Sequence, residues 1–332
     1  IQGRREYWNG VPSNTNLCYS EPDARRAFAD AVMLYAQEHP EVDYLHVWLA
    51  DEYNNICECE RCRSTTPSDQ YIALLNEIDA RLSTAGLATR IVLLLYQELL
   101  WPPVKEKLSN PSRFTLMFAP ISRTFSLSYA QRGPAPSIPP YRRNRIELPH
   151  SLEENLAFLE AWQSQCPLDS FVYDYPLGRA HYGDLGYHHI ARIIWQDIRE
   201  LHSLGLNGYI SCQELRAAFP NAFPEYVMGR MLWDPTQPFE DLEREYYSAL
   251  YADAWESVRD YLAGISRRSC CDYFNGIGPR QDPDMAALWA QGSDYVAHAY
   301  PAIQRRLPVK APLSKQAAEI LDYHAKYCTL LM

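Results

Sequence analysis

The chain alternates short runs rich in β-branched and aromatic residues with longer amphipathic stretches, and this alternation limits its fold more than any other feature. Such a pattern is typical of parallel strands joined by helical crossovers. Strands are predicted at residues 14 to 19, 43 to 49, 89 to 96, 114 to 120, 169 to 175 and 207 to 212. Helices are predicted between them, at residues 22 to 38, 68 to 86, 151 to 165 and 186 to 204. The sequence therefore predicts an α/β fold.

The number of strands indicates part of a TIM-type (β/α)8 barrel. A closed barrel of this type has eight parallel strands, so six predicted strands leave two to be supplied. The chain begins at Ile1 without a charged and then apolar leader, so either a signal was removed or the chain is a fragment. From the strand count we expect the other two strands in a segment before Ile1. On this count the strand at 43 to 49 is the fourth, and it ends at the face where barrel active sites form.

A boundary is predicted near residue 235, after the stretch "LWDPTQPF". Residues 1 to 235 are expected to form the catalytic barrel region. Residues 236 to 332 are expected to form a helical C-terminal extension. The helical patterns in this extension recur at about residues 239 to 266, 283 to 305 and 313 to 331.

Charge and hydropathy exclude two classes of partner, nucleic acid and a membrane span. The formal net charge is -10 and the only basic cluster is "YRRNR", residues 141 to 145, whereas nucleic-acid binding needs a clustered basic surface. This cluster lies in a loop from 126 to 149 whose length is typical of a lid or binding loop. A solvated surface and an anion or substrate contact both fit it. The longest apolar runs, such as "IVLLLY" from Ile91, fall far short of the roughly 18 residues that a membrane span needs.

Two adjacent acids, Asp51 and Glu52, follow the apolar run "HVWLA". Neighbouring residues inside a strand point to opposite faces, but past the strand end both side chains can turn toward one substrate. The two acids are therefore the candidate catalytic residues. A helix cap with a solvated acid is the competing structural interpretation.

Polar and aromatic side chains recur where the other apolar runs end, and the carboxyl ends of parallel strands meet at one face. A face lined by acids, Tyr and Trp, without a glycine-rich phosphate loop, favours glycoside hydrolysis, in which one acid protonates the leaving oxygen. The chain has 24 Tyr and 8 Trp. The predicted substrate-binding residues are Trp48, Asn54, Tyr96, Glu98, Tyr173, Asp174, Tyr175, Gln213, Glu214 and Arg216.

The stretch "CECERC" places Cys57, Cys59 and Cys62 close enough for their thiolates to share one metal ion. Cys18 is a possible fourth ligand from the end of an earlier strand. A closed set of four thiolates would be a structural Zn²⁺ site. A disulfide within the set and free thiols are the alternatives, and no cofactor for catalysis is expected.

The ordered series of motifs resembles a bacterial domain family, once of unknown function, that is partly assigned to glycoside hydrolase family 163. The resemblance covers about residues 3 to 265. Its motifs are "LCYSEPDAR", "VWLADEYNNICECERC", "LLLYQELLWPP", "FVYDYPLG", "LGLNGYISCQELR" and "YVMGRMLWDP".

This resemblance implies an endo-β-N-acetylglucosaminidase that cleaves complex N-glycans by a retaining mechanism assisted by the substrate's acetamido group. In that mechanism Glu52 is the general acid and base, and Asp51 orients the acetamido group. It also implies a glycan or glycoprotein substrate and a bacterial protein that is secreted, periplasmic or at the cell surface. Many members carry Asp-Asn or Asp-Gly where this chain has Asp51 and Glu52. The alternatives are an exo-acting hexosaminidase or uronidase, and a glycan-binding barrel without catalysis. The acids of such a barrel would stand too far apart or be paired with arginines such as Arg123 or Arg216.

Overall fold

The computed structural model describes residues 7 to 178, 180 to 214, 218 to 269, 271 to 274, 276, 278 to 308 and 311 to 332. The chain divides into two compact units, each with its own packed interior. Unit 1 comprises Ile1–Ser122, Gly133–Tyr173 and Gly205–Gly208, and unit 2 comprises Arg123–Arg132, Asp174–Leu204 and Tyr209–Met332. The predicted boundary near residue 235 falls inside unit 2, between two of its helices.

One parallel sheet of five strands takes the place of the predicted barrel, so the expectation of a closed TIM-type (β/α)8 barrel with six of its strands in this chain is wrong. The strands follow one another in chain order, and the register aligns Leu45 with Ile91 and Leu93 with Leu116. The fold is still α/β. The strands are β1 (Tyr44–His46), β2 (Arg90–Leu95), β3 (Phe114–Phe118), β4 (Ser170–Asp174) and β5 (Tyr209–Ser211).

Residues 14 to 19, which were predicted as a strand, do not form one. Side chains of this segment make hydrogen bonds to neighbouring segments in place of a backbone ladder. Residues 12 to 14 form a 3-10 turn. Asn16 then accepts from the backbone N–H of Ala50 and donates to Asn55, while Thr15 accepts from the backbone N–H of Trp8. Asn and Thr compete in this way for backbone partners that a sheet ladder would otherwise occupy.

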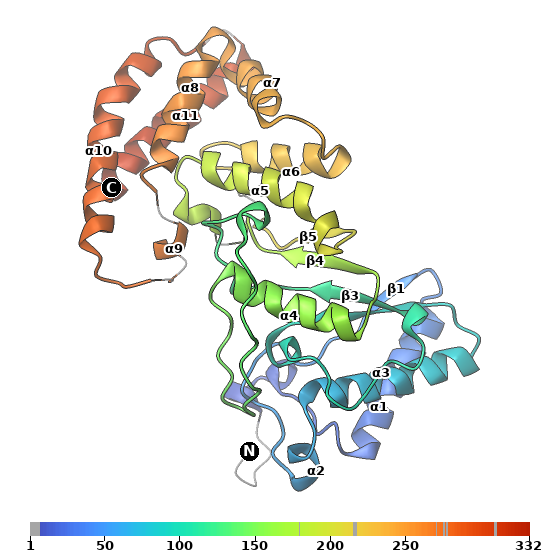
Figure 1. Cartoon of the computed structure of the whole chain (residues 1–332). Helices are drawn as coiled ribbons and strands as arrows, with labels where there is room; N and C mark the ends of the chain where they lie inside the picture. The colour runs from blue at the N-terminus through green and yellow to red at the C-terminus, as the bar shows by residue number, and fades with distance from the viewer. Residues whose placement is uncertain are drawn as a thin grey trace. The chain divides into compact units, whose positions relative to one another are not determined.

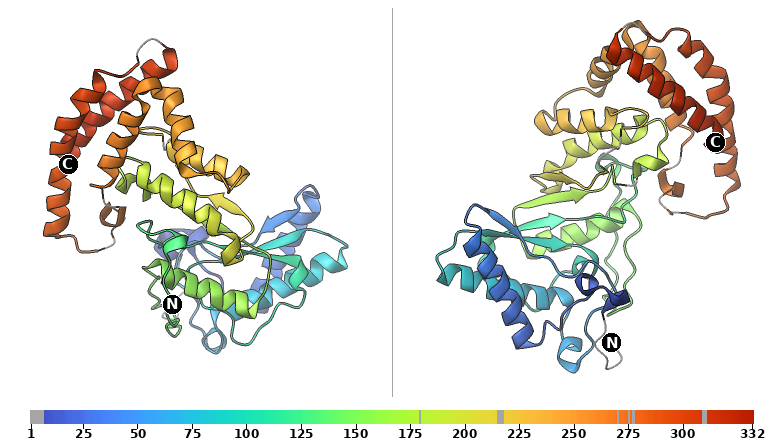
Figure 2. Two further views of the ribbon diagram at one scale, coloured as in Figure 1. Left: turned by 45° about the horizontal axis from the view of Figure 1, so that its top comes forward. Right: turned by 180° about the vertical axis from the view of Figure 1, so that it is seen from behind.

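Three long helices of unit 1 begin close to where the sequence predicts. Thr66 and Asp69 form a reciprocal capping box at the start of α3, and Ser151 and Glu154 form another at the start of α4. The helices α1 and α3 lie side by side (Figure 2). The helices of unit 1 are α1 (Pro22–Glu38), α2 (Glu60–Arg63), α3 (Pro67–Thr84) and α4 (Leu152–Gln165).

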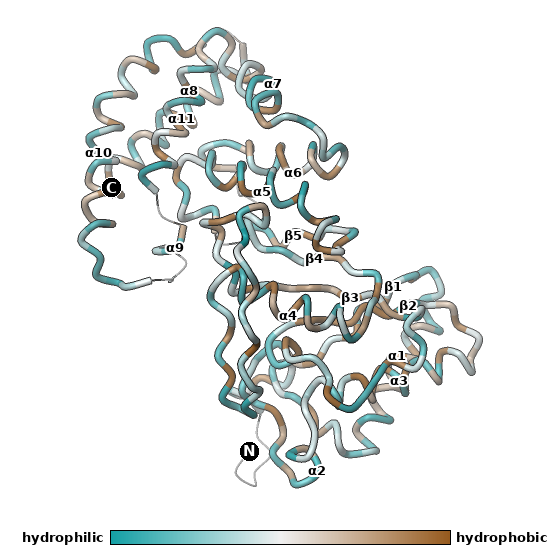
Figure 3. The backbone as a smooth tube through the Cα atoms, viewed as in Figure 1, coloured by the Kyte–Doolittle hydropathy of each residue, from teal (hydrophilic) through white to brown (hydrophobic). Residues whose placement is uncertain are grey.

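The interior of unit 1 forms around β2 and β3. Every residue of β3 is buried, and in β2 only Arg90 is not. The chain is strongly hydrophobic along these strands (Figure 3). Strands buried on both faces are typical of a parallel sheet covered by helices.

Unit 2 is mainly helical (Figure 1). The pattern predicted as one helix at 239 to 266 is two helices, because Ala252 between them adopts a left-handed φ of 45°. The helix α6 was not predicted. The helices are α5 (His188–Glu200), α6 (Phe223–Trp233), α7 (Phe239–Tyr251), α8 (Trp255–Ser266), α9 (Cys271–Phe274), α10 (Pro283–Gln304) and α11 (Pro312–Leu331).

Short 3-10 turns complete the secondary structure. They are Trp8–Gly10, Pro12–Asn14, Gln97–Leu100, Pro111–Arg113, Tyr129–Gln131, Ala180–Gly183, His202–Leu204 and Ala252–Ala254. Among the described residues, no helix combines the length and apolar character that a membrane span requires.

Candidate functional site

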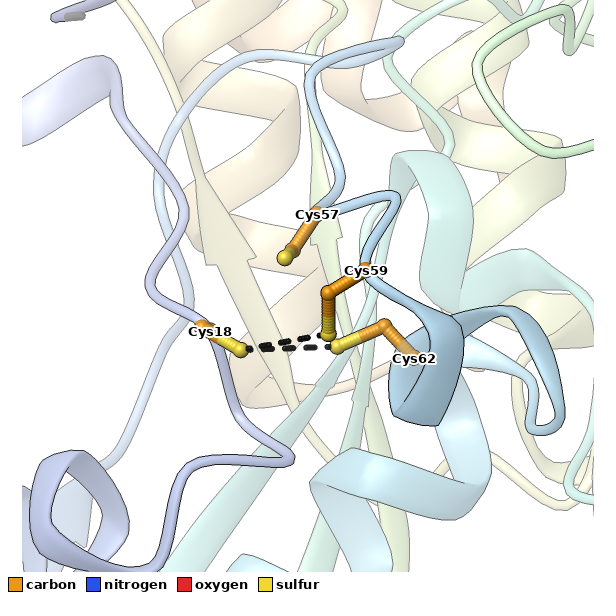
Figure 4. A group of neighbouring side chains, drawn as sticks. All are labelled: Cys18, Cys57, Cys59 and Cys62. Carbon is orange, nitrogen blue, oxygen red and sulfur yellow. Dashed lines mark hydrogen bonds between the residues drawn. The ribbon is translucent and has the colours of Figure 1, made fainter. Parts of the chain in front are cut away.

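Four thiols of unit 1 converge at one point (Figure 4). The Sγ atoms of Cys18, Cys57, Cys59 and Cys62 all lie within 4.8 Å of one another. Cys18 Sγ is 3.7 Å from the Sγ atoms of both Cys59 and Cys62. A disulfide needs about 2.05 Å between sulfur atoms, whereas the four cysteines are free thiols in this structure. The prediction that Cys18 joins the three loop cysteines as a possible metal-ligand set is confirmed.

The spacing of the sulfur atoms fits a tetrahedral metal centre. A Zn–S bond of about 2.3 Å places the corners of a tetrahedron about 3.8 Å apart. Cys62 is buried, Cys18 and Cys57 are half-buried, and Cys59 is exposed. Burial, together with hydrogen bonds to the other three thiols, raises the pKa of Cys18 to about 12. The backbone N–H of Cys62 favours the Cys59 thiolate and lowers its pKa to about 7.

Arg143 braces the loop that carries the thiols. Its guanidinium donates to the carbonyl oxygens of Cys57 at 3.0 Å, and of Cys62 and Thr65 at 2.6 Å each. The "YRRNR" stretch was expected either to be solvated or to contact an anion. Its Arg143 instead satisfies the carbonyl groups of Cys57 and Thr65, which lie outside any helix or strand. It also adds a donor to the carbonyl of Cys62 in α2, which already accepts from the backbone N–H of Thr65.

Two asparagines join the segments at residues 54 to 56 and 144 to 146, each by binding the backbone of the other segment. The side-chain amide of Asn54 binds both backbone groups of Ile146, accepting at 2.8 Å and donating at 3.2 Å. The side-chain amide of Asn144 binds both backbone groups of Ile56, accepting at 2.7 Å and donating at 2.8 Å. Both asparagines have left-handed φ values, 59° and 54°, which Asn tolerates better than most residues. We refer to these four residues as the asparagine clasp.

The predicted catalytic acids lie in the segment between β1 and the thiols. Asp51 is exposed and Glu52 is half-buried. The hydroxyl of Tyr96, just after β2, donates to Asp51 Oδ1 at 3.2 Å. Burial, followed by the negative charges of Asp51 and Glu52, raises the pKa of Tyr96 above its ordinary value. Within the described part of the chain, neither acid forms an ion pair with Arg, Lys or His.

Glu98 is a buried acid behind this pair. Only 4% of the residue is exposed, and burial raises its pKa to about 7. Its carboxylate accepts from the backbone N–H of Asn54. A cavity of about 20 Å³ lies beside it, lined also by Asn16, Ala50 and Tyr96. This is room for about one water molecule. Through its bond with the Asn54 N–H, Glu98 supports the segment that carries Asp51 and Glu52 from its buried side.

Aromatic side chains of β4 contact His46, at the end of β1, and Trp48, two residues beyond it. The rings of Trp48 and Tyr173 are 6.4 Å apart between centroids, and those of His46 and Phe171 are 6.3 Å apart. Trp48 is 42% exposed. The structure therefore brings together two of the predicted sugar contacts.

The remaining predicted substrate residues lie in unit 2, where Asp174 is buried and paired with an arginine. Arg123 donates to Asp174 at 2.9 Å and to Asp197 at 2.6 Å, and all three are buried. The backbone N–H of Tyr175 donates to the second oxygen of Asp174. This pairing with Arg123 is the arrangement that the non-catalytic alternative expected of its acids. Gln213 and Glu214 are exposed, Tyr175 packs against the core of unit 2, and Arg216 lies outside the described residues.

Sequence reasoning gave Asn54 the role of a substrate contact and Arg143 that of a solvated or ligand-binding residue, and it missed their roles in the brace and the clasp. Arg143, Asn144 and Ile146 act on a segment about 90 positions earlier in the chain. The only local signal was the pair of asparagines in turn-like stretches, "YNN" and "RRNR", where a left-handed residue is common.

A domain family described as a domain of unknown function, DUF4838, matches residues 2–263. This match confirms the resemblance to such a family, while its link to glycoside hydrolase family 163 stays a prediction. No curated protein and no solved structure matches the chain.

Proposed function

We propose that this chain, which belongs to the DUF4838 family, is a glycoside hydrolase that acts as an endo-β-N-acetylglucosaminidase on complex N-glycans. The observation that carries the proposal is the grouping of Asp51, Glu52 and Tyr96 beyond the carboxyl ends of β1 and β2. Open parallel sheets bind ligands at that edge. A secreted, periplasmic or cell-surface location follows from the proposed glycoprotein substrate.

In the proposed reaction the acetamido oxygen of the substrate attacks the anomeric carbon, and the bond to the leaving sugar oxygen breaks. Glu52 gives its proton to that oxygen. Asp51 holds the acetamido N–H and balances the positive charge of the oxazolinium ion. Glu52 then takes a proton from the water that opens this ring, so that two inversions retain the β configuration. Tyr96 fixes the orientation of the Asp51 carboxylate through its hydrogen bond.

Variants of the two acids test these roles. An activated aryl β-N-acetylglucosaminide needs little protonation, so Glu52→Gln should keep much of the first step on it. On a natural glycan the same variant should lose about 100 to 10,000-fold. Asp51→Asn should lose activity on both substrates, because it acts on the nucleophile. Azide should accelerate the Glu52 variant and yield a β-glycosyl azide, since this nucleophile needs no base.

Glu60→Gln is the matched control, because Glu60 is an exposed acid eight positions farther along the same segment. It should behave like the unmodified protein on both substrates. Equal losses for Asp51→Asn and Glu52→Gln on the aryl substrate, without azide rescue, would contradict the assignment of roles.

Two alternatives give different results in the same assays. An exo-acting hexosaminidase or uronidase would release single terminal sugars, whereas mass spectrometry should detect an intact released glycan for endo action. The sealed Arg123 and Asp174 pair favours, as a second candidate, a glycan-binding module without catalysis. Calorimetric binding of the N-glycan with no product after long incubation would support this module over the hydrolase.

We also propose that the four-thiol cluster binds Zn²⁺ as a structural ion. Four thiolates complete a tetrahedral shell and leave no position for water or substrate, which is typical of structural zinc. Elemental analysis of the reduced protein should find about one zinc per chain. Reduced protein that binds neither Zn²⁺ nor Cd²⁺ would contradict this site.

A further inference from the structure

The acid loop, defined here as residues 50 to 56, has no helix or strand of its own. Its conformation therefore depends on side chains from other segments. Ala50 N–H donates to Asn16, Asn54 N–H donates to Glu98, and Ile56 N–H donates to Asn144. Three separate parts of the chain thus hold three backbone groups that bracket Asp51 and Glu52.

Two of these parts are anchored at the thiol cluster. Asn16 lies two positions before Cys18, and its amide also donates to Asn55 at 2.6 Å. Asn144 follows Arg143, which holds the carbonyl oxygens of Cys57 and Cys62. The segments at 14 to 18 and 143 to 146 therefore contact the thiol cluster and the acid loop at once.

Without a metal, the link between Cys18 and the loop is weak. Thiols are poor hydrogen-bond donors and acceptors, and the contacts of Cys18 with Cys59 and Cys62 are 3.7 Å long. Four bonds to one ion would replace them with a fixed cross-link between residues 18 and 57 to 62. The net charge of -2 on four thiolates and Zn²⁺ would lie near Arg61, whose positive charge interacts with Cys18 and Cys59.

We propose that Zn²⁺ in the four-thiol cluster is a positioning centre for Asp51 and Glu52, acting through Asn16 on one side and the asparagine clasp on the other. The ion takes no part in the reaction. Its role in activity rests on the proposed hydrolase function, whereas its control of the acid loop does not.

Hydrogen exchange measures this control directly. Zinc is removed with a mercurial and a chelator, and excess thiol then removes the mercurial from the cysteines. This loss of zinc should speed exchange at the N–H groups of Ala50, Asn54 and Ile56 about tenfold or more. Helix α11 in unit 2 should keep its protection. Activity on the aryl glycoside should fall about 10 to 100-fold, the usual effect of losing groups that orient an active residue, and readded Zn²⁺ should restore both signals.

Cys59→Ser should reproduce the zinc-free state, because Cys59 is the exposed ligand and its loss leaves no cavity. Cys166→Ser is the matched control, since Cys166 is a buried cysteine of unit 1 outside the cluster. It should keep its zinc and normal exchange.

Four outcomes decide the proposal. Unchanged exchange at Ala50, Asn54 and Ile56 after complete zinc loss would overturn it, as would reduced protein that never binds zinc. Faster exchange in the acid loop alone supports it. If exchange responds to zinc but no glycoside is hydrolysed under any condition, the hydrolase function fails and the control of the loop stands.

Discussion

At the scale of single residues, burial sets the chemistry around the acid loop. The Glu98 carboxylate accepts from one backbone N–H and borders a cavity that holds about one water. With so few partners in a buried place, its ionised form is disfavoured. Asp51, five positions after β1, stays exposed. The sequence predicted Asp51 as catalytic and Glu98 as a substrate contact, but it could not predict how deeply each is buried, because the burial of a carboxylate depends on what packs over it. Glu98 is accordingly a positioning residue.

Replacing Glu98 by Gln should change how stability depends on pH. The folded pKa of about 7 lies above the ordinary value near 4.5, so the folded chain binds more protons than the unfolded chain between these values. Stability from this group is full below about pH 4.5 and is lost as the pH rises through about 7. Glu98→Gln should therefore gain up to about 3 kcal/mol relative to the unmodified protein between pH 5 and pH 8.

Denaturant unfolding of both proteins at several pH values measures that difference. Asp197 and Glu225 also have pKa values raised to about 7 by burial, so only the difference between the two proteins is informative. A difference that does not vary with pH would show that Glu98 ionises as readily as an exposed acid.

Tyr96→Phe should lower turnover of the aryl glycoside about tenfold. The change removes the hydroxyl that donates to Asp51 Oδ1 but keeps the ring, and a hydrogen bond to a charged group contributes about 1.5 kcal/mol or more. Tyr53→Phe is the control, because Tyr53 is exposed in the same loop. Equal rates for the two variants would mean that Asp51 needs no such donor.

At the scale of elements, the sequence predicted the starts of helices, because these depend on residues close together in the chain. The helices α1 and α3 begin within a residue of their predicted starts, because a proline at the first turn and the Thr66 capping box are readable from the sequence. The strand expected at residues 14 to 19 failed because Asn16 and Thr15 bind distant partners. The break at Ala252 was hidden within one continuous amphipathic pattern.

The asparagine clasp provides the prediction at this scale. Asn144→Gly keeps the left-handed backbone but leaves the N–H and C=O of Ile56 without their partners, at a cost of about 1 to 3 kcal/mol. Asn144→Ala should cost about 1 kcal/mol more, from the strained φ. Thermal unfolding measures both, and hydrogen exchange should localise the loss to residues 54 to 56. If the Ala variant is as stable as the Gly variant, the left-handed φ at position 144 causes no strain.

At the scale of the whole molecule, the strand count was the main error. Five parallel strands form where six of eight were predicted, because closure of a barrel is a long-range property that periodicity does not contain. Family membership and the grouping of four cysteines were predictable, since both depend on ordered sequence motifs. The pairing of Arg123 with Asp197 was not, because the two residues lie 74 positions apart.

Arg123→Met should destabilise unit 2 by about 3 to 5 kcal/mol, because two buried carboxylates lose their cation. Protonation relieves that cost, so the variant should be most stable in acid. Arg132→Met is the control, since Arg132 forms a partly exposed pair with Glu200 worth less than about 1 kcal/mol. Hydrogen exchange at Tyr129 N–H, which donates to Asp197, measures the effect, and equal losses in both variants would contradict the role of the pair.

The asparagine clasp also bears on the order of folding. It joins residues 92 and 88 positions apart in the chain, and contacts of such long separation form only after the intervening segments are compact. In refolding from denaturant, helical circular dichroism should therefore return before the acid loop is protected from exchange. Newly made chains would pass through a compact stage in which Asp51 and Glu52 are present but not yet held in place.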